Sequence, residues 1–277
     1  MISALSRFVR EHPRLFVLTG AGISTGSGIP DYRDDQGRWK RKPPVTLQDF
    51  MRSAAVRRRY WARSMIGWPV IANARPNAAH EALACLEGVA HVHRLVTQNV
   101  DGLHQRAGSA RVIELHGNIA GVACVDCHAE VSRHCVQQML EAANPGHLRL
   151  CAVTAPDGDA YLDLDDLDAF EVPDCSRCGG ILKPTVVFFG DVVPRHRVDA
   201  TMQALEQADA MLVVGSSLMI YSGYRFCEHA HRMQKPIAAI NLGHTRADHL
   251  FHLKIERPCE DALVDLIDRL NAAAHPS

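Results

Sequence analysis

Four polar side chains that could do chemistry follow two short, mainly apolar runs in the middle of the chain. These side chains are Gln98, Asn99, Asp101 and His116. The first three follow residues 95–97, and the fourth follows residues 111–115. Apolar runs that break abruptly into polar groups are typical of buried strands that end in a site. Carboxylate and amide groups can hold a polar ligand there, and an imidazole can accept a proton at neutral pH.

A glycine-rich turn follows the unbroken apolar run at residues 15–19. Its spacing is G-x-G-x-x-x-G, set by Gly20, Gly22 and Gly26. Such a turn after a buried strand brings backbone N–H groups, and the N-terminus of a following helix, close to a pyrophosphate. The spacing is one residue longer than the dehydrogenase fingerprint, and no acidic residue closes a second strand about 20 positions later. We therefore predict a phosphate-binding turn that is not that of a dehydrogenase; a tight turn without a ligand is the alternative.

Two further buried strands are predicted to end in small or polar residues. Residues 211–214 run into Gly215, Ser216 and Ser217, and residues 236–240 run into Asn241. Small residues leave room for a ligand against the backbone, and hydroxyl groups can donate to it. Because ligands of open α/β sheets bind at the carboxyl ends of strands, these segments should surround the same site as the glycine-rich turn.

Two Cys-x-x-Cys pairs indicate a metal site. The four residues are Cys124, Cys127, Cys175 and Cys178. Paired knuckles of this kind are typical of a structural zinc held by four thiolates, which leave no open position for a reactive water. The 47 residues between the pairs exceed the roughly 15–20 of a zinc ribbon, so this unit carries an insert. Cys135 and Cys151 in the insert are alternative ligands that we interpret as free thiols, and a redox role of the pairs is the other alternative.

The elements that position these residues alternate between helix and strand. Apolar spacing predicts helices at 2–12, 46–66, 76–89, 198–205 and 263–270, and strands at 15–19, 93–98, 111–116, 184–191, 211–214 and 236–240. This order predicts an α/β fold, with a doubly wound, mostly parallel sheet and an inserted small domain. We expect a larger Rossmann-like domain at 1–117 and 184–277, with a helical module at about 34–75. The small zinc-binding domain is expected at 118–183.

The composition excludes several kinds of partner. The chain has 277 residues, of which 47% are apolar and 22% charged, and its formal net charge is −1. A nearly neutral chain has no overall attraction to nucleic acid or to anionic membranes. No apolar run reaches the roughly 18 residues of a membrane span, and the first ten residues lack the features of a signal peptide. We expect no nucleic-acid or membrane partner, a monomer, and a cytoplasmic location if the chain is bacterial.

The sequence resembles the sirtuins, the NAD-dependent protein deacylases, over nearly its whole length. Besides both cysteine pairs, the matching segments are Gly20-Ala21-Gly22-Ile23-Ser24, Gly28-Ile29-Pro30-Asp31-Tyr32-Arg33, Thr97-Gln98-Asn99-Val100-Asp101, His116-Gly117, Val187-Phe188-Phe189-Gly190, Gly215-Ser216-Ser217 and Asn241-Leu242-Gly243. Within the family it is most similar to class II, the branch of the fourth mitochondrial sirtuin of animals and its bacterial relatives. Tyr60-Trp61-Ala62-Arg63, Val172-Pro173-Asp174-Cys175 and residues 189–191, 215–218 and 221–226 carry that second resemblance.

The resemblance implies that NAD binds along the strand ends and is consumed, giving nicotinamide, free lysine and O-acyl-ADP-ribose. The catalytic residues it implies are His116, Asn99 and Asp101. His116 is expected to deprotonate a ribose hydroxyl. Asp101 and Val100 are expected to hold the carboxamide, and Gln98 and Asn99 the nicotinamide ribose. The other expected cofactor contacts are Gly20, Ala21, Gly22, Ser24, Thr25, Asp31, Tyr32, Arg33, Gly215, Ser216, Ser217, Asn241, Leu242, Gly243 and Cys259.

The substrate that the resemblance implies is an acyl-lysine protein or peptide, which adds as a strand between two loops. The residues expected to contact it are Gly190, Tyr221, Val187 and Phe188, together with Tyr60 and Arg63. A Tyr-x-x-Arg pair at a similar place binds an acyl carboxylate in the desuccinylating branch, so we expect longer or acidic acyl groups to be preferred over acetyl. A structural ion pair of Arg63 is the alternative.

This chain departs from the family pattern near the predicted substrate loops. Most members have Glu at position 191 and Thr at 216, where this chain has Asp191 and Ser216. Their Val-x-Pro-Ala segment is replaced by Ile220-Tyr221-Ser222-Gly223. The rival functions are a mono-ADP-ribosyltransferase and a non-catalytic NAD-binding module. A dehydrogenase explains neither His116 nor the cysteine pairs.

Overall fold

The structure, a computed structural model, describes residues 2–41, 43–147, 153, 154, 156, 158, 160, 161 and 167–274. Its main sheet has six parallel strands in the order β11-β10-β9-β1-β2-β3. They are β1 (Leu15–Thr19), β2 (Val92–Thr97), β3 (Val112–Glu114), β9 (Ala210–Val214), β10 (Ile237–Ile240) and β11 (Leu253–Ile255). The predicted doubly wound α/β fold is confirmed, and β11 was not predicted.

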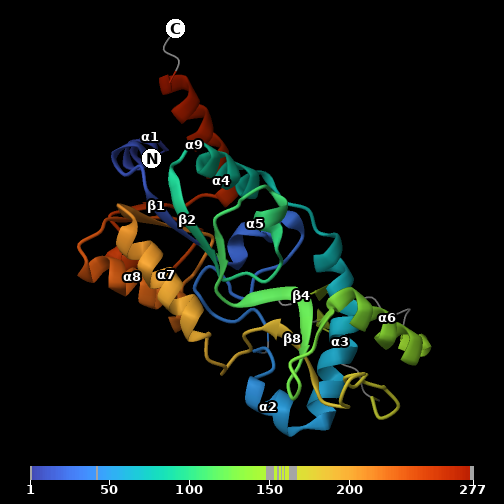
Figure 1. Ribbon diagram of the computed structural model, residues 1–277. Helices are drawn as coiled ribbons and strands as arrows, with labels where there is room; N and C mark the ends of the chain where they lie inside the picture. Colours follow the sequence, from blue (N-terminus) through green and yellow to red (C-terminus); the bar gives the residue numbers. More distant parts are fainter. Residues whose placement is uncertain are drawn as a thin grey trace.

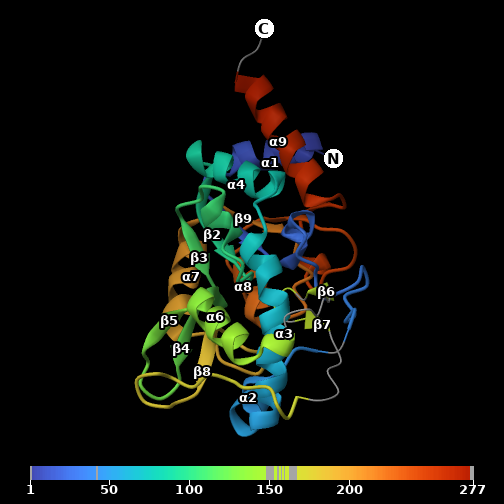
Figure 2. The ribbon, with the colours of Figure 1, turned by 90° about the vertical axis from the view of Figure 1, so that its right-hand side faces the viewer.

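Helices cover both faces of the main sheet (Figures 1 and 2). One face carries α1 (Ile2–Glu11), α4 (Ala78–Gly88) and α9 (Cys259–Ala274); the other carries α7 (Arg195–Gln207) and α8 (Tyr221–Arg232). Leu15 and Val17 of β1 belong to the core on the first face, and Phe16 and Leu18 to the core on the second. Because both faces are buried, the inner strands β1, β9 and β10 are nearly continuous apolar runs in the sequence.

A second, three-stranded antiparallel sheet has the order β5-β4-β8. Its strands are β4 (Gly117–Cys124), β5 (Glu130–Ser132) and β8 (Leu182–Val186). The prediction of a strand at 184–191 in the main sheet is therefore wrong: the strand ends at Val186 and pairs with β4. Residues 187–189 are apolar because they line a cavity, not because they belong to a sheet. The predicted domain boundary at 183/184 falls inside β8, and the division into domains stays a prediction.

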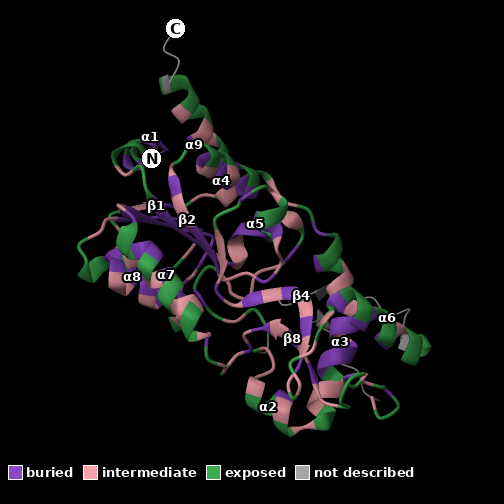
Figure 3. Cartoon of the chain, in the orientation of Figure 1, coloured by how far each residue is buried: buried purple, intermediate pink, exposed green. Residues whose placement is uncertain are grey.

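Helices beside the small sheet share its core. They are α2 (Leu47–Arg52), α3 (Ala54–Asn73) and α6 (Arg133–Ala143). The single helix predicted at 46–66 is two helices, because the Ser53 side chain caps α3 by accepting from Val56 N at 3.3 Å. Figure 3 shows the buried side of α3 against α6 and β8. None of the helices in the described part of the chain has both the length and the apolarity needed to cross a membrane.

A buried arginine joins α6 to α3. Arg133 has no exposed surface, and its guanidinium donates to Gln137 Oε1 at 2.8 Å and to Ser64 O and Oγ, each at 3.1 Å. It also lies over the rings of Trp61 and Trp68, at 5.3 and 4.8 Å. Burial lowers its pKa to about 10, so it stays protonated at neutral pH. These contacts fix the helix that carries Tyr60 and Arg63 against the small sheet.

The remaining elements are short. They are α5 (Leu103–Arg106), β6 (Val153–Thr154), β7 (Ala160–Tyr161) and the 3₁₀ turns η1 (Ala21–Ile23), η2 (Thr25–Ser27), η3 (Pro145–His147) and η4 (Asp248–Leu250).

Candidate active site

A cavity of about 600 Å³ lies at the carboxyl ends of the main-sheet strands, around β1, which pairs with β2 on one side and with β9 on the other. The predicted residues that line it are Gly20, Ala21, Gly22, Ser24, Thr25, Asp31, Tyr32, Arg33, Tyr60, Gln98, Asn99, Val100, Asp101, His116, Val187, Phe188, Gly190, Gly215, Ser216, Ser217, Tyr221, Asn241, Leu242 and Cys259. Apart from the four predicted zinc ligands, two of the predicted site residues do not line the cavity: Gly243 and Arg63, both in the described part of the chain.

The glycine-rich turn packs directly on the turn after β9. Gly22 N donates to Gly215 O at 2.8 Å, and Gly20 N to Val214 O at 3.2 Å. A Cβ added at Gly20 would lie 2.7 Å from Ser216 Cβ, and one at Gly22 would lie 2.9 Å from Gly215 O. Two short 3₁₀ turns follow, rather than the α-helix that the phosphate-binding pattern implied. Only glycine permits this close approach, which leaves a backbone cradle open to an extended ligand such as a dinucleotide.

Ser24, Asn99 and Asp101 form one hydrogen-bonded group. Ser24 Oγ donates to Asp101 Oδ2 at 2.8 Å, and Leu103 N donates to Asp101 Oδ1 at 2.9 Å. Asn99 Nδ2 donates to Ser24 Oγ at 3.0 Å and to Gly20 O at 3.1 Å. Both carboxylate oxygens of Asp101 therefore already accept a bond, which favours a role in orienting a ligand over one in proton transfer.

Gln98 connects the ends of three strands. Its side-chain Nε2 donates to Ser216 Oγ at 2.8 Å and to Thr19 O at 3.3 Å. Its backbone oxygen accepts from His116 Nδ1 at 2.9 Å. β1, β2 and β9 thus meet at one side chain, and the same residue fixes the ring of the predicted base.

His116 lies between the two sheets, two residues after β3 and directly before β4. Its Nε2 is 2.8 Å from Ser222 Oγ on α8, and its backbone oxygen accepts from Val187 N at 2.8 Å. Burial lowers the pKa of His116 to about 4, and the positive charges of Arg225 and Arg197 act in the same direction. The ring is therefore neutral at pH 7 and can accept a proton. Ser222 and Arg225 were not predicted; the departure at residues 220–223 was the signal available in the sequence.

Aromatic contacts pack the loop at residues 31–40, which follows the glycine-rich turn, against Phe189. The rings of Tyr32, Trp39 and Phe189 lie 5.6–5.9 Å apart in edge-to-face pairs. Arg33 lies over the Trp39 ring at 4.0 Å and donates to Gly37 O at 2.7 Å, while Asp31 pairs with Lys40. The loop therefore brings the aromatic rings of Tyr32 and Trp39 to one side of the cavity, which Asp31 and Arg33 also line.

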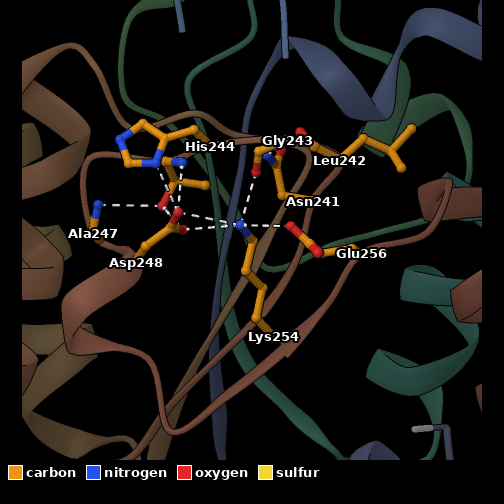
Figure 4. A network of polar contacts seen from close by, with 9 residues as sticks. Asn241, Leu242, Gly243, His244, Ala247, Asp248, Lys254 and Glu256 are labelled. Atoms are coloured by element: carbon orange, nitrogen blue, oxygen red, sulfur yellow. Dashed lines mark hydrogen bonds and ion pairs between the residues drawn. The ribbon is translucent and has the colours of Figure 1, made fainter. Parts of the chain in front are cut away.

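The turn after β10 lines the cavity through Asn241 and Leu242. Polar and ionic contacts of Lys254 and Asp248 stabilise this turn (Figure 4). Lys254 Nζ donates to Gly243 O at 2.8 Å and pairs with Asp248 at 3.1 Å. His244 Nδ1 lies 3.0 Å from the same carboxylate. Gly243, which does not line the cavity, has φ +73° and packs on the Asp35 backbone. Its role is thus to shape this turn rather than to contact a ligand.

An apolar arm extends the cavity toward the small sheet. It is lined by Pro44, Val45, Tyr60, Pro156, Val186 and Phe188. The Phe188 ring lies 5.3 Å from that of Tyr60 and 5.1 Å from that of Phe50, and Lys183 Nζ lies 4.8 Å from its centre on another side. Tyr60, Val186 and Phe188 are all buried, so this part of the cavity is lined by side chains with little exposed surface.

The four predicted zinc ligands are brought together at the far end of the small sheet. Their sulfur atoms all lie within 4.8 Å of one another; Cys124 Sγ is 3.5 Å from Cys178 Sγ, and Cys127 Sγ is 3.7 Å from Cys175 Sγ. Sulfurs at about 2.3 Å from a tetrahedral zinc are about 3.8 Å apart, so the cluster fits that metal. Cys135 is exposed and outside the cluster. Cys151 lies outside the described residues.

Comparison with known proteins identifies the family. The chain matches the Sir2 family over residues 20–222. An NAD-dependent protein deacetylase of Bordetella bronchiseptica is 57% identical over 266 residues, which are 96% of this chain and 97% of that protein. The NAD-dependent protein lipoamidase sirtuin-4, mitochondrial, of Bos taurus is 48% identical over 270 residues, 96% and 85% of the two chains. A structure of Sir2 with a p53 peptide and NAD⁺ has a TM-score of 0.80 and 29% identity, covering 97% of this chain and 98% of that one. The chain therefore belongs to the Sir2 family, as its resemblance to the sirtuins predicted.

Proposed function

We propose that this chain is an NAD-dependent protein-lysine deacylase that prefers acyl groups longer than acetyl. The observation that carries the preference is the apolar arm between α3 and β8. The wall residues Val45, Tyr60, Val186 and Phe188 offer a methylene chain no charged partner and much apolar surface to cover. The relative from Bos taurus is named a lipoamidase, and a lipoyl group is a long, uncharged acyl chain.

NAD supplies an electrophilic ribose carbon with nicotinamide as its leaving group. In this chain the glycine cradle fits the pyrophosphate, and Asp101, held by Ser24 and the Leu103 amide, is fixed to orient the carboxamide. His116 is the base, and Nε2 is the nitrogen that receives the proton. The zinc holds the small sheet and takes no part in the chemistry, since four thiolates leave no open coordination position.

The acidic acyl groups that Tyr60 and Arg63 suggested rank second. Arg63, a described residue, does not line the cavity, whereas the arm itself is apolar. A carboxylate placed there would lose its hydration, and the described residues of the arm offer it no charged partner, since Lys183, 4.8 Å from the centre of the Phe188 ring, does not line the cavity.

A panel of acyl-lysine peptides tests this proposal. Wild type would be assayed with acetyl, octanoyl, lipoyl, succinyl and glutaryl peptides, with O-acyl-ADP-ribose and ADP-ribosylated protein both followed by mass spectrometry. We expect the highest kcat/KM for octanoyl and lipoyl peptides. Val45→Phe should fill the arm and reduce that preference by at least tenfold while sparing acetyl. Arg63→Ala should leave the relative rates unchanged, as should Arg59→Ala at an exposed position of the same helix.

Two outcomes would contradict the proposal. A preference for succinyl or glutaryl peptides that disappears in Arg63→Ala would assign Arg63 to an acyl carboxylate. ADP-ribosylated protein without O-acyl-ADP-ribose would favour the transferase alternative.

A further inference from the structure

The base has a partner that the family pattern does not provide. Ser222 replaces the proline of the Val-x-Pro-Ala segment, and its hydroxyl lies 2.8 Å from His116 Nε2. Proline has no side-chain donor or acceptor, so no such contact exists in chains that keep that pattern. Both residues line the cavity, and they lie 106 positions apart in the sequence.

The direction of this hydrogen bond follows from the other ring nitrogen. His116 Nδ1 is 2.9 Å from the backbone oxygen of Gln98, and a carbonyl oxygen can only accept. Nδ1 therefore carries the hydrogen of the neutral ring, and Nε2 is bare. The Ser222 hydroxyl donates to it and occupies its only lone pair. Any proton that reaches Nε2 must then displace this hydroxyl or pass through it.

The fold holds the Ser222 backbone at this place. Ser222 is in the first turn of α8, where Gly223 N and Tyr224 N both donate to Ile220 O at 3.2 Å. Arg225 Nε donates to the Ser222 carbonyl at 3.1 Å, so the arginine that lies near His116 also fixes the serine. This backbone keeps the Ser222 hydroxyl within hydrogen-bond reach of the base, where it can pass a proton on.

We propose that Ser222 is a proton-relay residue between the ribose hydroxyl of the co-substrate and His116. The ribose hydroxyl gives its proton to Ser222 Oγ as Ser222 gives its own proton to His116 Nε2, and the ribose oxygen is free to attack the acyl carbon. The serine hydroxyl is thereby restored, and the imidazolium later returns its proton to the departing lysine amine. Arg225 on α8 and Arg197 on α7 disfavour the imidazolium and so promote that return.

The test separates two steps of one reaction. Nicotinamide leaves before the base acts, whereas formation of O-acyl-ADP-ribose needs it. In Ser222→Ala we expect exchange of labelled nicotinamide into NAD to stay within about twofold of wild type, and O-acyl-ADP-ribose formation to fall at least tenfold. Ser222→Thr, which keeps the hydroxyl, should recover most of that loss. Ser3→Ala, the same change at an exposed position of α1, is the control.

A second readout does not depend on turnover. Nitrogen NMR of the His116 ring in the ligand-free protein should show a protonated Nδ1 and a bare, hydrogen-bonded Nε2. The Nε2 signal should shift in Ser222→Ala while Nδ1 stays. Three results would overturn the relay: a ring protonated on Nε2, an equal fall in both steps in Ser222→Ala, or an unchanged or faster O-acyl-ADP-ribose step. The last would mean that the ribose hydroxyl displaces the serine.

Discussion

Loss of the zinc should abolish deacylation, although no zinc ligand lines the cavity. β4 and β8 run antiparallel from the cysteine cluster to the base: Cys124 pairs with Leu182 at one end, and Gly117 with Val186 at the other. His116 directly precedes β4, and its oxygen accepts from Val187 N at 2.8 Å. Between these two pairs β8 advances by four residues, about 13 Å at about 3.3 Å per residue, so the metal acts through this pair of strands and not by contact.

The magnitude follows from comparing two free energies. Structural zinc in small sites contributes about 10–16 kcal/mol to folding. Whole domains are stable by only about 5–15 kcal/mol. Without the metal, β4 and β8 should therefore open near the cysteines and lose their register at His116. The main sheet has separate apolar cores on its two faces and should stay folded.

The assay uses Cys175→Ala, which removes a buried ligand. Zinc content would be measured by atomic absorption, local stability by amide hydrogen exchange, and activity by O-acyl-ADP-ribose formation. We expect fast exchange in β4 and β8, slow exchange in β1 and β9, and a rate at least a hundredfold below wild type. Cys135→Ala, at an exposed cysteine outside the cluster, should behave as wild type. A zinc-free Cys175→Ala protein with normal protection in β4 and a normal rate would refute this reasoning.

Three further predictions concern buried groups near the site. Burial lowers the pKa of His80 to about 4 and that of His104 to about 3. The unfolded chain therefore binds protons below pH 6.5 that the folded chain does not, and the free energy of unfolding should fall by about 2 kcal/mol per ring between pH 7 and pH 5. Urea titrations at both pH values test this, and His104→Gln should remove about half of the loss; equal stability at the two pH values would contradict it. The pKa of His116 is lowered to about 4, so kcat/KM should keep its plateau down to about pH 5, and an acid limb near pH 6.5 in the pH–rate profile would be inconsistent with this lowered pKa. Gly117→Ala should lower the free energy of unfolding clearly more than Gly28→Ala, for which a loss of roughly 1–2 kcal/mol is expected. The two glycines have nearly the same φ, +83° and +82°, but only a Cβ at Gly117 would overlap a backbone oxygen, that of Thr185. Equal losses of unfolding free energy in chemical denaturation would exclude the clash.

Local sequence signals predicted much of this molecule. The strands β1, β9 and β10 were evident because strands buried on both faces are nearly unbroken apolar runs, and β2 was evident from Leu95 and Val96 just before the polar Gln98. Gln98 and His116 stood out because a parallel sheet exposes polar groups where its strands end. The cysteine pairs were evident because each knuckle is contained in four residues.

The features that the sequence missed depend on contacts between distant segments. β11 has three residues, too few to show a period. The apolar run at 184–191 predicted a core strand, yet Val187 and Phe188 are apolar because they line the cavity. The Tyr60–Arg63 spacing placed both residues on one side of α3, but only the packing of that helix decides which of them reaches the cavity.

The position of His116 explains why both sheets are needed for one reaction. Its ring is fixed by Gln98 at the end of β2 and by Ser222 on α8, both parts of the larger unit. Its backbone oxygen is fixed by Val187, which follows β8 of the small sheet and lines the same cavity. A shift of the small sheet would therefore move Val187, Phe188 and the predicted base His116 together, while Asp101 and the glycine cradle stayed on the main sheet. Since a displacement of about 1 Å can cost a hundredfold in rate, the zinc can control acyl transfer while leaving the nicotinamide end of the site intact.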